Sequence, residues 1–210
     1  MSMKKRVHTL VVGVLLLSSL GGCATTSPHD PLEPYNRAMF QFNDTMDKAL
    51  IKPVAQGYET IVPRPVRLGV NNFFSNLGDV WIGINNLLQG KFANAISDFG
   101  RVAVNTTLGF YGVLDIASEA GLEKHHEDFG QTLAKWGVGS GPYVVLPLLG
   151  SSTVRDTVAK VVADNRADVV TQSEHVPTRN SAFVLRTVDT RAEYLNAGNV
   201  LDQAALDPYT

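Results

Sequence analysis

The densest group of titratable side chains in this 210-residue sequence is His125-His126-Glu127-Asp128. A metal centre or an acid–base pair needs side chains of these types to converge on one point. Adjacent residues on a helix diverge, and this run lies in a polar connection before a helix that Asp128 can cap. We therefore expect a solvated loop and neither a metal site nor a catalytic site. A hydrolase that uses the His125 region is the enzymatic alternative.

A glycine-rich run follows at residues 137–141 (Gly-Val-Gly-Ser-Gly). It fits neither the G-x-G-x-x-G fingerprint nor a P-loop, and Ser140 lacks the spacing of a G-x-S-x-G nucleophile elbow. These glycines predict backbone turns that allow close packing. We therefore expect a protein that is not an enzyme and that carries no cofactor.

Cys23 is the sole cysteine, and the residues before it have the layout of a secretory signal. Residues 4–6 (Lys-Lys-Arg) form a positive start, and residues 10–17 form an apolar run too short to cross a hydrocarbon core of about 30 Å as a helix. The run leads to residues 20–23 (Leu-Gly-Gly-Cys), which resemble the lipobox of bacterial lipoproteins. In such proteins the thiol is acylated and the chain is cut just before the cysteine.

This interpretation divides the chain into a signal peptide (1–22), a lipidated tether (23–30) and a folded domain (31–210). Ala24 follows the cysteine, a pattern that in Gram-negative lipoproteins is typical of sorting to the outer membrane. We therefore expect a protein anchored by lipid on the periplasmic side of the outer membrane. One acyl chain binds a membrane only marginally, so stable anchoring requires more than one.

The charge of the mature chain argues against binding by bulk electrostatics. Loss of residues 1–22 removes three positive charges and no negative one, leaving 15 Lys and Arg against 20 Asp and Glu, a formal −5. Such a chain is not expected to bind nucleic acid. No later apolar run is long enough to span a bilayer as a helix. Any deeper membrane contact must come from amphipathic helices.

Apolar residues recur at helical spacing along most of the mature chain. Prolines and glycines interrupt this pattern, and we expect breaks at Pro53, at residues 63–65, at Gly78-Asp79 and at Gly90. Pro53 can begin a second short helix that runs to about Ile61. A last long helix is predicted from about Arg179 to a break at Gly198. The clearest apolar stripes lie in residues 35–50, 66–77, 92–106 and 152–162.

One long stretch, residues 137–150, reads as non-helical because of its glycines and prolines, and its apolar residues predict a buried extended segment. The fold class is therefore all-α: a single domain of many short amphipathic helices with little or no β-structure. Local spacing leaves two arrangements open, a compact globule and a ring of helices.

Several short motifs, in order along nearly all of the mature chain, resemble the MlaA (VacJ) family of outer-membrane lipoproteins. They are DPLEP-x-NR-x-MF-x-FN (30–43), NF-x-SNLG (72–78), NNLLQGK (85–91), GVG-x-GPY-x-x-LP-x-x-G (137–150), VRD (154–156) and DPY (207–209). Each motif alone is weak, and together they are specific.

The resemblance implies a doughnut-shaped helical protein, sunk into the inner part of the outer membrane, with an amphipathic channel through it. Family members remove mislocalised phospholipids from the outer leaflet, pass them to the periplasmic carrier MlaC, and associate with trimeric porins. The other hypothesis is a lipid-anchored periplasmic scaffold or interaction protein, which should have a hydrophilic exterior.

Within the motifs, the side chains and turns that we assign to the lipid channel are Phe42, Asn43, Gly139, Gly141, Pro142, Tyr143, Arg155 and Asp156. The pair Arg155-Asp156 is either a structural ion pair, the preferred interpretation, or a contact for a lipid head group. Trp81 and Trp136 are either interface anchors or core residues.

Two departures from the family bear on these assignments. The chain stops at Thr210, where members of the family continue. Residues 164–178 lack the aromatic, apolar character that the resemblance implies, so we assign no channel residue there.

Overall fold

The structure is a computed structural model that describes residues 30–205 and 207–209. The predicted signal peptide, Cys23 and almost all of the predicted tether lie outside these residues. Three elements form the first helical run: α2 (Glu33–Met46), the π-helix η2 (Asp47–Ile51) and α3 (Lys52–Ile61).

The helix predicted from Pro53 to about Ile61 is confirmed as α3, in whose first turn the missing N–H of Pro53 costs no hydrogen bond. The chain enters α3 from α2 without an interruption, through the wider turn of η2.

Helix α4 (Arg64–Leu88) runs without interruption for 25 residues, so the predicted break at Gly78-Asp79 is wrong. Asp79 is buried, and its Oδ1 accepts a 2.6 Å hydrogen bond from Lys124 Nζ, 45 residues away in sequence. A tertiary contact therefore fixes a position where local sequence favours a new helix start. The predicted stop at Gly90 is confirmed, with a left-handed φ of 77° just past the helix end.

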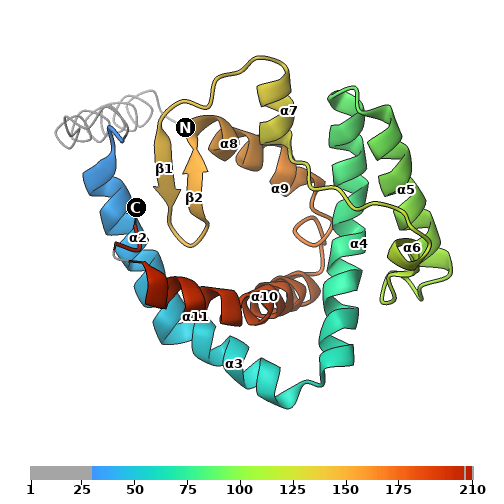
Figure 1. The fold of residues 1–210 in the computed structure, drawn as a ribbon, viewed down its shortest axis with the longest axis horizontal. Helices are drawn as coiled ribbons and strands as arrows, with labels where there is room; N and C mark the ends of the chain where they lie inside the picture. Colours follow the sequence, from blue (N-terminus) through green and yellow to red (C-terminus); the bar gives the residue numbers. More distant parts are fainter. Residues whose placement is uncertain (1–29, 206, 210) are drawn as a thin grey trace, which may run out of the picture.

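Helix α5 (Phe92–Thr107) packs along α4, and the short helix α6 (Ile116–Glu119) follows. The packing is tight at Gly83 of α4, where a Cβ atom would lie 2.9 Å from a ring carbon of Phe99. Figure 1 shows α5 and α6 on the outer side of α4.

Helix α7 (Phe129–Lys135) begins at Asp128, whose side chain accepts a hydrogen bond from Gln131 N, as a capping residue should. The antiparallel hairpin of β1 (Tyr143–Leu146) and β2 (Gly150–Thr153) comes next, with Val145 opposite Ser151.

The stretch 137–150 is therefore non-helical, as predicted, but it is not buried throughout. Val145 is 1% exposed, whereas Leu148 and Leu149 at the hairpin end are 62% and 59% exposed.

After the hairpin come α8 (Val154–Ala159), a second π-helix η3 (Lys160–Asp164) and α9 (Asn165–Ala167). The last two helices are α10 (Val176–Glu193) and α11 (Leu195–Ala204).

The last long helix thus starts three residues before Arg179, and the chain breaks at Tyr194, not at Gly198. Helix α10 is tied to the first helical run by two 2.8 Å bonds from Arg191 to Asp47, and by a 2.8 Å bond from Tyr58 Oη to Asp189. Burial, helped by this hydrogen bond, raises the pKa of Tyr58 to about 12.

The prediction of an all-α fold with little β-structure is confirmed, since the hairpin is the sole sheet among the described residues. Figure 1 shows the elements following one another round a circuit: α2 and α3, then α4, then α7 to α9 and the hairpin. Residues 207–209 return to α2, where Arg37 pairs with Asp207 at 2.9 Å. No helix in the described part of the chain combines the length and apolar character needed to cross a membrane.

The interior of the described chain is more polar than apolar. Eleven polar or charged side chains are buried, against eight apolar ones, five of which are alanine. Large apolar side chains lie on the outside instead, and Ile61, Phe110 and Ile96 are 80%, 76% and 72% exposed. In globular proteins in water, large apolar side chains are more often buried.

Candidate functional site

Most of the buried polar side chains lie between α4, α5 and residues 115–132, and we call these the polar cluster. Arg101 of α5 is 1% exposed and donates two bonds of 2.9 and 3.0 Å to Asp115, and one of 2.7 Å to Leu122 O. Its Nε lies 3.5 Å from the buried Asp79. A buried guanidinium with these partners holds two helices and a loop in one arrangement.

Asp115 is the capping residue of α6 and stays ionised in this cluster. Burial opposes its charge, but hydrogen bonds from Ser118, Asn105 and Arg101 outweigh that effect and lower the pKa of Asp115 to about 2.

The run 125–128 is a connection without regular structure, as predicted, but it is less solvated than expected. His125 Nδ1 lies 2.9 Å from the buried Asp98, and Glu127 accepts bonds from Lys91 at 2.7 Å and Gln89 at 2.8 Å. These side chains close the polar cluster. In residues 30–205 and 207–209 no three His, Cys, Asp or Glu side chains are grouped to hold a metal.

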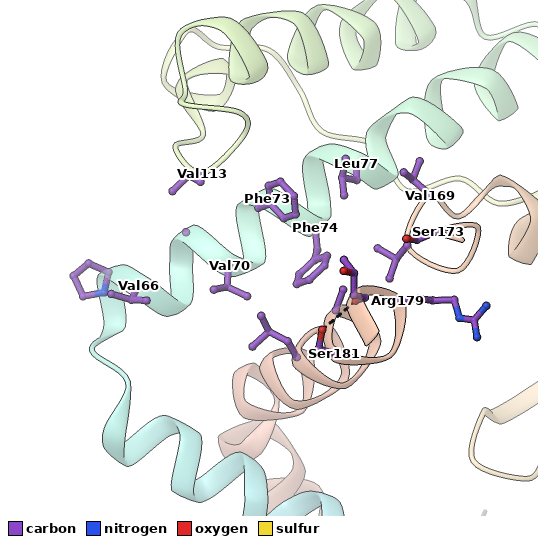
Figure 2. Close-up of a pocket in the computed structure, with 16 residues that line it drawn as sticks. Val66, Val70, Phe73, Phe74, Leu77, Val113, Val169, Ser173, Arg179 and Ser181 are labelled. Atoms are coloured by element: carbon purple, nitrogen blue, oxygen red, sulfur yellow. Dashed lines mark hydrogen bonds between the residues drawn. The ribbon is translucent and has the colours of Figure 1, made fainter. Parts of the chain in front are cut away.

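An apolar pocket of about 820 Å³, which can take a ligand, lies between α4, the 168–175 loop and the first half of α10. Figure 2 shows Val66, Val70, Phe74 and Leu77 on α4 facing Ser181 and the loop across this space. Its volume falls within the range of about 300–1,000 Å³ typical of ligand pockets. The lining residues are Pro65, Val66, Gly69, Val70, Phe73, Phe74, Leu77, Val113, Val169, Val170, Ser173, Thr178, Arg179, Ser181, Ala182 and Leu185.

Two local contacts set the walls of this pocket. Gly69 lets the turn after α5 approach α4, because a Cβ atom there would lie 2.9 Å from a methyl carbon of Val113. The 168–175 loop is held to α10 by Asp168, which accepts bonds of 2.7 and 3.1 Å from Arg186. The pocket walls are therefore fixed by a glycine contact and a bidentate ion pair.

The predicted channel residues Phe42 and Asn43 both lie in α2, and Asn43 contacts the hairpin. Asn43 donates a 2.9 Å bond to Leu146 O and accepts a 2.7 Å bond from Leu148 N, and Phe42 is 43% exposed. The side-chain amide of Asn43 thus attaches the hairpin to α2 through two hydrogen bonds.

The other predicted channel residues gather where the hairpin meets α7 and α8. Arg155 Nε donates a 2.7 Å bond to Asp156 Oδ1, the structural ion pair that we preferred, and Tyr143 Oη lies 2.7 Å from Ser151 Oγ. Arg155 first, and then Thr153, lower the pKa of Asp156 against the effect of its burial.

The glycine–proline part of this group has mixed surroundings. Gly141 has a left-handed φ of 69° and lies close to Val154, whereas Gly139 has no such neighbour. Pro142 O accepts a 3.1 Å bond from Val154 N. None of the eight predicted channel residues lines the apolar pocket, and their assignment to a channel stays a prediction.

Sequence reasoning found one wall of the pocket and missed the other. The stripe of residues 66–77 is visible in the sequence, but Val169, Val170 and Ser173 lie in the stretch to which we assigned no channel residue. The apolar pair Val169-Val170 was the one indication of this wall in the sequence. The fold shows that the pair faces α4 across the pocket.

The two tryptophans differ in their surroundings. Trp81 Nε1 donates a 2.8 Å bond to Asp164 Oδ1 and its side chain is partly buried, whereas Trp136 is 54% exposed. The turn formed by residues 108–114 carries further exposed rings, since Phe110 and Tyr111 are 76% and 73% exposed.

A helical protein with a mainly polar interior, many exposed large apolar side chains and an apolar pocket has the polarity expected of a protein in contact with lipid. The family model described as MlaA lipoprotein matches residues 28–210. The chain belongs to the MlaA lipoprotein family, so the resemblance seen in the motifs is confirmed.

Named relatives agree with this assignment. The chain is 36% identical to the intermembrane phospholipid transport system lipoprotein MlaA of Escherichia coli K12, over 99% of this chain and 84% of that protein. It is 31% identical to the protein of the same name in Haemophilus influenzae, over 97% of this chain and 85% of that protein. A solved chain from "Structural basis for maintenance of bacterial outer membrane lipid asymmetry" matches with a TM-score of 0.74 and 36% identity, over 86% of this chain and 91% of that one.

Proposed function

We propose that this protein transports phospholipid between membranes and so maintains the lipid asymmetry of the outer membrane. The proposal rests on membership of the MlaA family and on the relatives' names. It needs no reaction centre, because the transported molecule leaves unchanged.

The structural observation that carries the proposal is the exposure of many large apolar side chains around a mainly polar interior, which we call the reversed polarity of the molecule. Apolar surface gains about 25 cal/mol per Å² when it leaves water, and side chains such as Ile61, Ile96 and Phe110 forgo this gain in an aqueous environment. In a bilayer the same side chains are in contact with hydrocarbon. Because no described helix can span the membrane, the helices would lie along it, as amphipathic helices do.

The apolar pocket between α4 and α10 suits the acyl chains of a phospholipid. An acyl chain has no hydrogen-bonding groups, and the walls of this pocket offer it phenylalanine, valine and leucine side chains. A polar path for the head group would be supplied by the ring of elements, with the predicted channel residues around the hairpin at its edge.

We further propose that acylated Cys23 anchors the protein on the periplasmic side of the outer membrane. From there it would take misplaced phospholipid from the outer leaflet and hand it to the soluble carrier MlaC, next to a trimeric porin. These finer steps rest on the family resemblance and on the lipobox.

The alternative function, a lipid-anchored periplasmic scaffold, required a hydrophilic exterior. The exposed apolar side chains of α3, α5 and the 108–114 turn argue against that exterior. No observation on the described residues favours the scaffold over the transporter.

The test is to block the pocket in cells. Ala182→Phe fills the space between α10 and α4, whereas Ala103→Phe adds the same ring to an exposed position on α5. In a Gram-negative host that lacks its own family member, we expect wild type and Ala103→Phe to keep outer-leaflet phosphatidylethanolamine low. Labelling of intact cells with a membrane-impermeant amine reagent measures it.

With Ala182→Phe, labelling should rise to the level of cells without the protein, while membrane fractions still contain the variant in normal amount. Normal labelling with a blocked pocket would contradict a role for this pocket in transport. Normal labelling in cells that lack the protein altogether would contradict the proposed function itself.

A further inference from the structure

Arg179 is the one cationic side chain that lines the apolar pocket. Figure 2 shows its side chain running away from Phe73 and Phe74, with the guanidinium clear of the other labelled side chains. The stem of the arginine therefore borders the apolar space, and its charge lies outside it. A phospholipid has the same order of parts, with tails next to an ester-linked phosphate.

Within the described residues Arg179 has no ion-pair partner. Ten of the fifteen Lys and Arg residues there lie within 4.0 Å of an acidic oxygen, and Arg179 is not one of them. The neighbouring arginines of the same helix, Arg186 and Arg191, are both held in bidentate pairs with Asp168 and Asp47. The guanidinium at the pocket is thus left with its donors available.

The position of Arg179 in its helix is also unfavourable for the protein alone. It lies in the first turn of α10, which has no acidic residue. The positive end of a helix dipole repels a cation, so this arginine does not stabilise α10. An anion placed beside the guanidinium would be attracted by both the side chain and the helix end.

From these observations, and resting on the proposed function, we infer that Arg179 binds the phosphate of a lipid whose acyl chains occupy the pocket. The substrate class is therefore a glycerophospholipid, distinguished from neutral diacylglycerol by this one contact. The arginine would determine which lipid enters the pocket. It would not change the affinity of the apolar walls for the acyl chains.

The experiment compares two fluorescent lipids with identical acyl chains, phosphatidylglycerol and diacylglycerol, titrated into the full-length chain in detergent micelles. Wild type should prefer phosphatidylglycerol by roughly ten-fold, the value of a charge-assisted hydrogen bond. Arg179→Gln should lose this preference while its affinity for diacylglycerol is unchanged, and Arg179→Lys should keep most of it. Arg166→Gln is the control, because Arg166 is an exposed arginine on α9 without an ion pair among the described residues and away from the pocket.

Three results would count against the inference or against the proposed function. An unchanged preference in Arg179→Gln would overturn the inference and leave the proposed function standing. Equal loss of both lipids would overturn it too, because the arginine would then only shape the pocket. Failure of wild type to bind either lipid would contradict the proposed function, and this outcome is distinct from the other two.

Discussion

Arg101 shows how one buried charged residue holds several segments of this fold together. Its guanidinium bonds to Asp115, Ser118 and the carbonyl of Leu122, and it approaches the buried carboxylate of Asp79. A buried charge is costly unless it is paired, so each member of this cluster depends on the others.

Arg101→Ala should therefore destabilise the protein by about 3–5 kcal/mol, because it removes the partner of Asp115 and leaves the buried Asp79 with Lys124 as its one remaining cation. Arg101→Lys keeps the charge but loses the bidentate contact with Asp115. Its stability should therefore lie between that of Arg101→Ala and that of wild type. Thermal unfolding in detergent micelles, followed by circular dichroism, ranks the stabilities of the three proteins. If Arg101→Ala unfolds at the same temperature as wild type, the polar cluster does not stabilise the fold.

The acid range offers a second test at this scale. The pKa of Asp115 is lowered from 3.8 to about 2, so its contribution to stability is complete above pH 4 and is lost as the pH falls toward 2. The contribution is about 1–2 kcal/mol, after allowance for its partial exposure.

We expect the unfolding temperatures of wild type and Asp115→Asn to differ at pH 5 and to converge near pH 2. Glu119→Gln changes an exposed carboxylate on α6, and its curve should run parallel to that of wild type. A constant gap between wild type and Asp115→Asn across this range would show that the ionised Asp115 does not contribute.

At the scale of elements, the hairpin is attached to α2 by two asparagines. Asn36 is fully buried, donates a 3.1 Å bond to Tyr143 O and accepts a 2.8 Å bond from Val145 N. Asn43 accepts from Leu148 N, three residues further along the hairpin. Each amide oxygen thus protects one backbone N–H.

Asn36→Leu should speed hydrogen exchange at the Val145 amide by ten-fold or more, since an unmade buried hydrogen bond costs about 1–3 kcal/mol. Asn43→Leu should have its effect at Leu148, so each variant is the control for the other. Exchange resolved by mass spectrometry of short peptides distinguishes them. If hydrogen exchange became uniformly faster over the whole hairpin in both variants, the two asparagines would not be separate points of attachment.

The 108–114 turn is the element that most plainly faces outward. Phe110 and Tyr111 hold left-handed φ values of 57° and 61°, which side chains of their size rarely adopt. Only glycine fits at position 109, where a Cβ atom would lie 2.1 Å from Leu114 O. A strained, well-fixed turn that exposes two rings is suited to insertion at the membrane interface.

Replacing Phe110 and Tyr111 with serine should lower partition into phospholipid vesicles by about ten-fold or more, because two apolar side chains no longer leave water. Glu119→Ser is the matched control on the adjacent α6. Flotation of the Cys23→Ala protein with vesicles removes the contribution of the lipid anchor. Equal flotation of the double variant and wild type would mean that this turn does not insert.

Elements that depend on local signals were predictable, and those that depend on distant partners were not. The cap at Asp128 and the stop at Gly90 follow from the neighbouring sequence. The passage of α4 through Asp79 depends on Lys124, and the second wall of the pocket depends on how the 168–175 loop folds back on α4. Neither partner is visible in a window of local sequence.

At the scale of the whole molecule, family membership and polarity lead to the same conclusion. The motifs predicted a helical protein that works with lipid, and the described residues combine a mainly polar interior with many exposed large apolar side chains. The detailed channel assignment remains a prediction, because the eight residues concerned lie around the hairpin and α8, away from the apolar pocket.

The most direct test of this reversed polarity is the behaviour of the mature chain without its anchor. We expect the Cys23→Ala protein to require detergent or a nanodisc, to aggregate when detergent is removed, and to copurify with phospholipid. Size-exclusion chromatography with light scattering, followed by lipid extraction, measures all three. A lipid-free monomer that stays soluble in buffer alone would contradict the account.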